Sequence, residues 1–287
     1  MCLNTSHGRA AARRLITQIR NVDLLVLIVR AFDDPSVPPY RNSVNPVRDL
    51  TELKTELLLA DLEQVTVRIE RLEKQLTKPT KIQAQDKAEL ALHKKLQQAI
   101  ESEKPISSVI ETDAEREIIR SFGFLTLKPM VIAVNVGENQ LEQKFDFGET
   151  VEKNTPVITL CGKLEYELSQ LDDESRATFM AEMGIKESAV SKFVGSCYSV
   201  LGLISFLTVG SDEVRAWPIK QGTSALDAAG KVHSDIKRGF IRAETFNYKD
   251  FKELGNEKAI KAGGKIRLEG KEYVVRDGDI INFRFNV

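Results

Sequence analysis

Two unbroken hydrophobic stretches, LLVLIV at residues 24–29 and KPMVIAV at residues 128–134, decide the fold class of this 287-residue chain. A strand with one solvent-facing side alternates between hydrophobic and polar residues. An unbroken run therefore predicts a strand covered on both faces, as in a parallel sheet. A third run, at residues 156–161, predicts a third strand. Because helical patterns separate the three, the expected fold class is α/β with a parallel sheet.

A heptad pattern lies between the first two strands. Its hydrophobic positions are four and three residues apart: Leu58, Leu62, Val65, Ile69, Leu72 and Leu76. This predicts a helix that ends at Thr77-Lys78-Pro79-Thr80, because proline cannot continue it. A second helix, at residues 86–101, carries Leu92, Leu96 and Ile100 on one face. We expect an antiparallel helical hairpin rather than an intermolecular coiled coil, because fewer than four heptads repeat.

The last 85 or so residues have the pattern of a small mixed α+β module. Strands are expected at 213–219 and 240–246, a strand-turn-strand at 265–275, and a tight Asp-Gly turn at 276–279. In the final strand Ile281, Phe283 and Phe285 alternate with polar residues, which predicts one buried face. We expect the single Trp217 to lie in the core of this module.

Composition excludes several classes of protein. Lys and Arg number 41 against 42 Asp and Glu, so the chain as a whole is not a basic, DNA-binding protein. The longest hydrophobic run is far too short to span a bilayer, and we expect no membrane association. Cys2, Cys161 and Cys197 show no pairing or zinc-site pattern, which fits a reducing cytoplasm.

The sharpest short motif is Asn135-Val136-Gly137-Glu138, directly after the second strand. Ligands of open α/β sheets bind at the carboxyl ends of strands. An Asn followed three residues later by a carboxylate is how P-loop nucleotide hydrolases read a purine base. Here Val136 stands in place of the usual Lys and Glu138 in place of Asp, which predicts weaker discrimination of guanine. The alternative interpretation is a strand-to-loop junction with an Asx turn.

In this context the motif resembles the YchF/Obg-like ATPase family. The resemblance covers about residue 15 to the end and rests on further segments: Ile19–Asp23, Val44–Asp49, Glu56–Leu62, Phe124–Pro129, Ser205–Thr208, Glu213–Trp217, His233–Glu244 and Gly278–Val287. It implies a partial P-loop-type sheet with an inserted helical hairpin, followed by a β-grasp TGS domain. The implied divisions are 1–46 for the partial G-domain, 47–122 for the helical insertion, 123–202 for the rest of the G-domain and 203–287 for the TGS domain.

The resemblance also implies a function, namely a purine-nucleotide-linked protein that binds ATP or GTP and associates with the ribosome. The implied base-site residues are Asn135, Val136, Glu138, Cys161 and Gly162. Magnesium is expected for the family, but no ligand for it is identifiable in this sequence. A basic cluster in the C-terminal module is a candidate surface for ribosomal RNA. Its members are Lys231, His233, Lys237, Arg238 and Arg242. The alternative is an ordinary solvated face.

One departure from the family concerns the phosphate site. The sequence contains no Gly-x-x-x-x-Gly-Lys-Ser/Thr loop, and His7-Gly8-Arg9 is not a substitute. We therefore expect weak nucleotide binding and no hydrolysis by this chain alone. The strand at 24–29 would then have an open edge, which predicts self-association or a partner strand. Two alternatives are a non-catalytic RNA or ribosome adaptor, and a full ATPase or GTPase of which these residues are a part.

Overall fold

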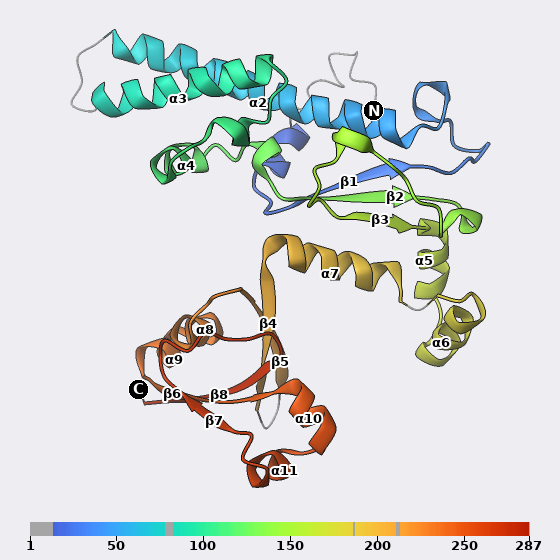
Figure 1. Cartoon of the computed structure of the whole chain (residues 1–287), viewed down its shortest axis with the longest axis vertical. Helices are drawn as coiled ribbons and strands as arrows, with labels where there is room; N and C mark the ends of the chain where they lie inside the picture. The colour runs from blue at the N-terminus through green and yellow to red at the C-terminus, as the bar shows by residue number, and fades with distance from the viewer. Residues whose placement is uncertain (1–13, 78–82, 186, 211–212, 287) are drawn as a thin grey trace. The chain divides into compact units, whose positions relative to one another are not determined.

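The structure is a computed structural model, which describes residues 14–77, 83–185, 187–210 and 213–286 (Figure 1). The chain forms two compact units that divide between Ser196 and Cys197. Cys2, the His7–Arg9 segment and the proposed helix stop at Lys78–Thr80 lie outside the described residues. In the described part of the chain, no helix is long and apolar enough to cross a membrane.

The first unit is built on a parallel sheet. Its strands are β1 (Leu25–Arg30), β2 (Met130–Asn135) and β3 (Val157–Leu160), in that order. Leu25 lies opposite Met130, and Ile132 lies opposite Val157. The three predicted strands are therefore confirmed, and their carboxyl ends share one edge of the sheet. Cover on both faces is not complete for β1, because Ile28 is 66% exposed.

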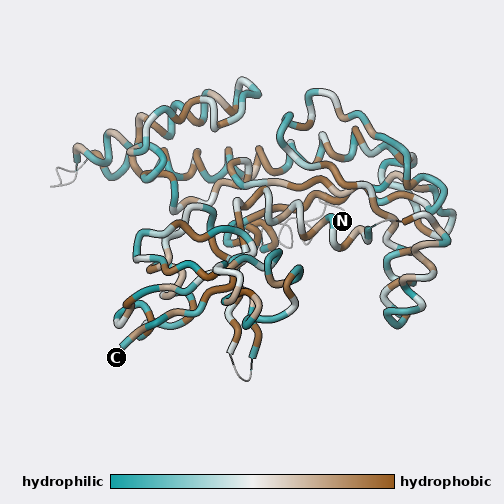
Figure 2. Tube along the Cα trace, turned by 60° about the horizontal axis from the view of Figure 1, so that its bottom comes forward, coloured by the Kyte–Doolittle hydropathy of each residue, from teal (hydrophilic) through white to brown (hydrophobic). Residues whose placement is uncertain are grey.

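The long helix α2 (Pro46–Leu76) has two different partners along its length. Near its start, Leu50 and Leu57 pack into the hydrophobic core of the sheet, which contains the strands' buried residues. Figure 2 colours the chain by hydropathy and shows long hydrophobic stretches in this first unit. Further along, Val65 and Leu72 pack against α3 (Gln83–Glu101). The heptad pattern begins at Leu58 and covers only the second part of the helix, whereas α2 itself begins at Pro46. Its N-cap is Asn45, whose side chain accepts a hydrogen bond from the backbone of Arg48.

The helical hairpin is confirmed. Leu92, Leu96 and Ile100 of α3 share a buried cluster with α2, and the Arg68 guanidinium donates to both carboxylate oxygens of Glu89 at 2.6 and 2.9 Å. The following helix, α4 (Asp113–Arg120), begins with a capping box between Thr112 and Glu115. The remaining elements of this unit are η1 (Tyr40–Asn42), η2 (Ile106–Val109), η3 (Leu125–Leu127), η4 (Glu138–Gln140), η5 (Gly148–Thr150), α5 (Gly162–Ser169), α6 (Asp173–Glu182) and α7 (Ala189–Leu201), which continues into the second unit.

The second unit is a five-stranded mixed sheet in the order β5-β4-β8-β6-β7. Its strands are β4 (Leu203–Val209), β5 (Val214–Lys220), β6 (Phe240–Asn247), β7 (Arg267–Glu269) and β8 (Asp279–Phe285). β4 pairs antiparallel with β5 and parallel with β8, as expected for a β-grasp arrangement. Trp217 packs against the core of this unit, as predicted. Sequence analysis missed β4 and four helices, α8 (Ala225–Val232), α9 (Ser234–Arg238), α10 (Tyr248–Leu254) and α11 (Glu257–Ala262).

One expectation for this unit was wrong, and a second, for the final strand, holds for Ile281 and Phe283 only. The second strand of the hairpin at 265–275 does not form, because the Tyr273 carbonyl accepts a hydrogen bond from Ala225 and Val275 is buried in the core. The final strand does not simply bury one face. Ile280 is also buried, in a cluster with Ile260 of α11, whereas Phe285 is 45% exposed. The helices after β6 thus cover part of the second face of the sheet.

Candidate functional site

The site begins where β2 and β3 end. Asn135 is the last residue of β2, and its Oδ1 accepts a hydrogen bond of 2.9 Å from the backbone N–H of Gly162, the first residue of α5. A Cβ at position 162 would lie 3.4 Å from Oδ1 and 3.5 Å from Nδ2 of Asn135, which is ordinary van der Waals contact, so the approach does not itself require glycine. Among the described residues, Nδ2 has no hydrogen-bond acceptor. The structure therefore brings these two predicted residues together, with one amide donor free.

A charged pair lies beside this contact. Glu138 Oε1 accepts a hydrogen bond of 2.8 Å from Lys163 Nζ, and both side chains are substantially exposed. This hydrogen bond raises the pKa of Lys163. Sequence analysis missed Lys163. The signal was available, because Lys163 follows the third strand as closely as Glu138 follows the second, and both strands end at one edge.

Two of the predicted base-site residues have buried side chains. Val136 is 2% exposed and Cys161 is 3% exposed, and both belong to the hydrophobic core of the sheet. A side chain packed into that core cannot also lie over a base. Val136 therefore does not take the place of the lysine that covers the base in related hydrolases. Only the backbone groups of these two residues remain available to a ligand.

The loop after β1 forms the third side of this edge. The Arg30 guanidinium donates to the carbonyls of Phe32 and Val37, both at 2.8 Å, and lies 4.6 Å from the centre of the Phe32 ring. Phe32 in turn adjoins Gly137, because a Cβ built on that glycine would lie 3.8 Å from Phe32 Cβ. Arg30 thus fixes the backbone of this loop beside the Asn135–Glu138 motif.

The carboxylate of Asp34 is engaged within its own loop. Asp34 follows β1, and its Oδ1 accepts hydrogen bonds from both the backbone and the hydroxyl of Ser36. The side-chain hydrogen bond to Ser36 is the main reason why the pKa of Asp34 is lowered. In the described ranges no group of three His, Cys, Asp or Glu side chains could hold a metal ion.

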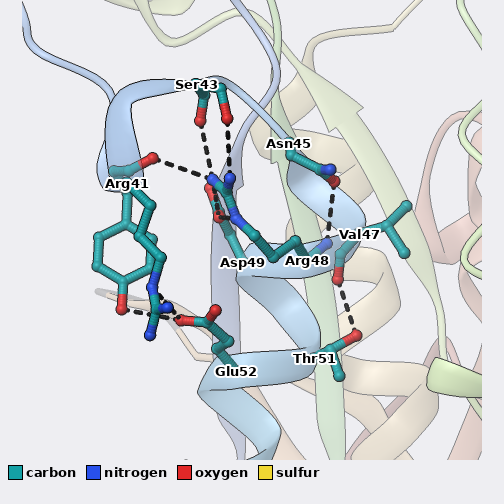
Figure 3. Close-up of polar contacts among 9 residues, drawn as sticks. Arg41, Ser43, Asn45, Val47, Arg48, Asp49, Thr51 and Glu52 are labelled. Carbon is teal, nitrogen blue, oxygen red and sulfur yellow. Dashed lines mark hydrogen bonds and ion pairs between the residues drawn. The ribbon is translucent and has the colours of Figure 1, made fainter.

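A network of polar contacts fixes the segment that leads into α2 (Figure 3). Arg48 donates to Ser43 Oγ at 2.8 Å, to the Ser43 carbonyl at 2.8 Å and to Asp49 at 2.7 Å. Arg41 and the hydroxyl of Tyr40 both contact the Glu52 carboxylate, at 3.2 and 2.9 Å. This segment, which the sequence marks by Asn45-Pro46-Val47-Arg48-Asp49, thus has a defined path between β1 and the long helix.

The basic cluster of the second unit is only partly assembled. Lys237 pairs with Asp227 at 2.8 Å, and Arg238 pairs with Asp235 at 2.9 Å. His233 caps α9 by accepting a hydrogen bond at Nδ1 from the backbone of Asp235.

The two remaining members of the cluster point in different directions. Lys231 is an exposed residue of α8, the helix that covers the core of this sheet. Arg242 alternates along β6 with Ala243, which belongs to the core beneath α8, and therefore points to the opposite face. Lys231, His233, Lys237 and Arg238 thus lie on or beside α8 and α9, and Arg242 lies on the strand β6.

Comparisons with known proteins agree with this architecture. Residues 203–286 match the family model YchF-GTPase_C, described as a protein of unknown function (DUF933). The chain is 40% identical to "Ribosome-binding ATPase YchF" of Bacillus subtilis, over 98% of the chain and 78% of that protein. It is 37% identical to human "Obg-like ATPase 1", over 98% of the chain and 72% of that protein. The solved structure of the Schizosaccharomyces pombe YchF GTPase matches with a TM-score of 0.80 and 32% identity, over 94% of this chain and 74% of that one.

The parallel sheet with its inserted hairpin, the polar edge at Asn135 and the mixed C-terminal sheet define an α/β protein related to the P-loop GTPases. Likeness in both sequence and structure narrows this further. The chain belongs to the YchF/Obg-like ATPase family.

Proposed function

We propose that this chain binds a purine nucleotide, ATP or GTP, and associates with the ribosome in the cytoplasm. The observation that carries the nucleotide part is the Asn135 amide, which Gly162 holds through Oδ1 while Nδ2 stays free. The names of the relatives, ribosome-binding ATPase and Obg-like ATPase, support the assignment.

The polar edge suits a purine. Asn135 Nδ2 offers a donor to a ring nitrogen, and the Glu138 carboxylate offers an acceptor to an exocyclic amino group. Glu138 has one methylene more than the aspartate used for strict guanine reading, and Lys163 holds one of its oxygens at 2.8 Å. We therefore propose that the site accepts both adenine and guanine, since selectivity requires a fixed pairing geometry.

The phosphate-binding part of a nucleotide site requires a different motif. Backbone N–H groups of a Gly-x-x-x-x-Gly-Lys-Ser/Thr loop normally cradle the phosphates, and the 287 residues contain no such loop. We propose that these residues alone bind nucleotide weakly and do not hydrolyse it.

Replacing Asn135 with alanine should weaken ATP and GTP binding about tenfold, because the change removes a free amide donor and the bond that positions α5. Isothermal titration calorimetry of the 287-residue chain measures this. Asn139→Ala is the matched control, since Asn139 lies in the next turn and is exposed. Equal affinity for Asn135→Ala and the parent chain would remove Asn135 from the site.

The second candidate function is a non-catalytic RNA or ribosome adaptor. It is favoured if neither ATP nor GTP, at millimolar concentration, changes the melting temperature. We propose that the second unit is the TGS domain, with residues 203–287 as its extent and ribosomal RNA as its contact. This stretch contains 15 Lys and Arg against 12 Asp and Glu, and the excess of positive charge supports that contact.

We also propose that the outer edge of β1 pairs with another strand, from a partner or from a second copy. β1 is one of the two edge strands of the described sheet. Its odd-numbered residues, such as Leu25, direct their backbone N–H groups to β2, so the N–H and C=O groups of its even-numbered residues point away from β2. Ile28 on this strand is 66% exposed. An exposed apolar edge strand of this kind favours association.

An Ile28→Lys variant should therefore lower the proportion of dimers or larger species, because a charged side chain opposes pairing along this edge. Sedimentation velocity at high protein concentration measures the proportion. Val157→Lys, on the opposite edge strand β3, is the control. A parent chain that sediments as a single monomeric species would contradict self-association.

A further inference from the structure

The second unit contains a cavity of about 390 Å³ that is partly open to solvent and is lined by residues of β6, α10, β7 and β8. Figure 1 labels these four elements. The side chains that line it are Asn247, Asp250, Lys265, Arg267, Arg276 and Asp279. Ligand sites for small molecules usually occupy about 300–1,000 Å³, so the cavity is large enough for a small ligand. Because most of its lining side chains carry a charge, the ligand must be polar.

The main acidic group of the lining is already used inside the protein. Asp279 is fully buried, and its Oδ2 accepts hydrogen bonds from the Tyr273 hydroxyl at 2.7 Å and from the Arg276 backbone at 3.0 Å. Its Oδ1 lies 3.4 Å from the Arg267 guanidinium. Burial, with the hydrogen bond to Asp279, raises the pKa of Tyr273 to about 12, so the hydroxyl keeps its proton at neutral pH.

The remaining acceptors are engaged as well. Asp250 pairs with Lys265 at 3.2 Å. The amide oxygen of Asn247 accepts a hydrogen bond of 2.9 Å from the backbone of Lys249, which caps α10. A cation entering the cavity would therefore have to displace existing donors.

Donors, by contrast, are in surplus. Arg276 is exposed, and in the part of the chain that the structure describes its guanidinium has no partner. The Asn247 Nδ2 group likewise lacks an acceptor among those residues. Lys265 and Arg267 are 54% and 38% exposed and keep further N–H groups. Three cationic side chains against two carboxylates leave the lining net positive.

We propose that this cavity binds a phosphate group, supplied by a free nucleotide or by an RNA backbone. A guanidinium offers paired N–H donors that match phosphate oxygens. Arg276 provides the first contact, with Lys265 and Asn247 beside it. The site is separate from the Asn135 edge, since all of its residues belong to the second unit.

The test uses the 287-residue chain carrying Asn135→Ala, so that binding at the base site does not contribute. Inorganic pyrophosphate is titrated calorimetrically at low salt. Arg276→Gln should weaken its binding about tenfold, as expected for loss of a charge-assisted contact. Lys265→Gln, a second variant of the lining, should also weaken it. The control Lys271→Gln removes an exposed charge of the same unit outside the cavity and should leave the affinity unchanged.

Competition then identifies the source of the phosphate. Displacement of pyrophosphate by ADP points to a nucleotide, and displacement by a short single-stranded RNA points to an RNA backbone. The proposal is overturned if pyrophosphate does not bind. It is equally overturned if Arg276→Gln and Lys265→Gln reduce the affinity no more than Lys271→Gln does. Failure of the base site, measured through Asn135 with ATP and GTP, leaves this result unaffected.

Discussion

Replacing Asp61 with asparagine should destabilise the first unit by about 3–5 kcal/mol, because one partner of a buried ion pair is removed and the other stays behind. Asp61 is fully buried on α2, and its Oδ1 accepts a hydrogen bond of 2.8 Å from Arg20. The same carboxylate accepts from the backbone N–H groups of Leu125 and Thr126, at 3.0 and 2.9 Å, and from the Thr126 hydroxyl at 2.9 Å. An asparagine amide would place a donor against some of these donors.

The consequence should be visible in thermal unfolding. Asp61 joins the segment before β1, the long helix and the approach to β2, so its loss should lower the melting temperature of this unit by roughly 10 °C. Asp23→Asn is the control, because Asp23 is exposed, and we expect a change within about 0.5 kcal/mol. A melting temperature for Asp61→Asn equal to that of Asp23→Asn would show that the carboxylate network contributes little.

Replacing Gly123 with alanine should cost about 2–3 kcal/mol, from two separate causes. Gly123 has φ of +57°, which disfavours any residue with a Cβ. In addition, a Cβ at this position would lie 2.8 Å from the Arg20 carbonyl oxygen, so the backbone around the Arg20–Asp61 pair would have to shift. The Gly123 carbonyl itself accepts a hydrogen bond of 3.2 Å from Arg20.

Gly184→Ala separates the two causes. Gly184 has φ of +67°, but nothing lies within 4 Å of the position that its Cβ would occupy. This control should therefore cost only the conformational part, about 1 kcal/mol. Chemical denaturation of both variants measures the difference, and equal losses at the two glycines would mean that the contact with Arg20 relaxes without cost.

Much of the first unit follows from local sequence patterns. Unbroken runs of Val, Ile and Leu predict β1 to β3, and the heptad positions predict the α2–α3 hairpin. Such signals depend on neighbours within one or two turns, so a single sequence carries them. Strand β4 and helices α10 and α11 gave no comparably clear signal, because short elements are fixed mainly by the sheet on which they pack.

The features of the candidate site also fall into those that the sequence predicts and those that depend on tertiary contacts. The sequence by itself placed Asn135 and Glu138 at a strand end, since the ends of parallel strands share one edge of a sheet. Only the tertiary structure decided that Gly162 holds the Asn135 amide, that Lys163 pairs with Glu138, and that Val136 turns into the core. It also decided that Lys237 pairs with Asp227 and Arg238 with Asp235. The physical reason is that residue type and spacing set the local conformation, whereas side-chain partners depend on groups brought together from distant parts of the chain.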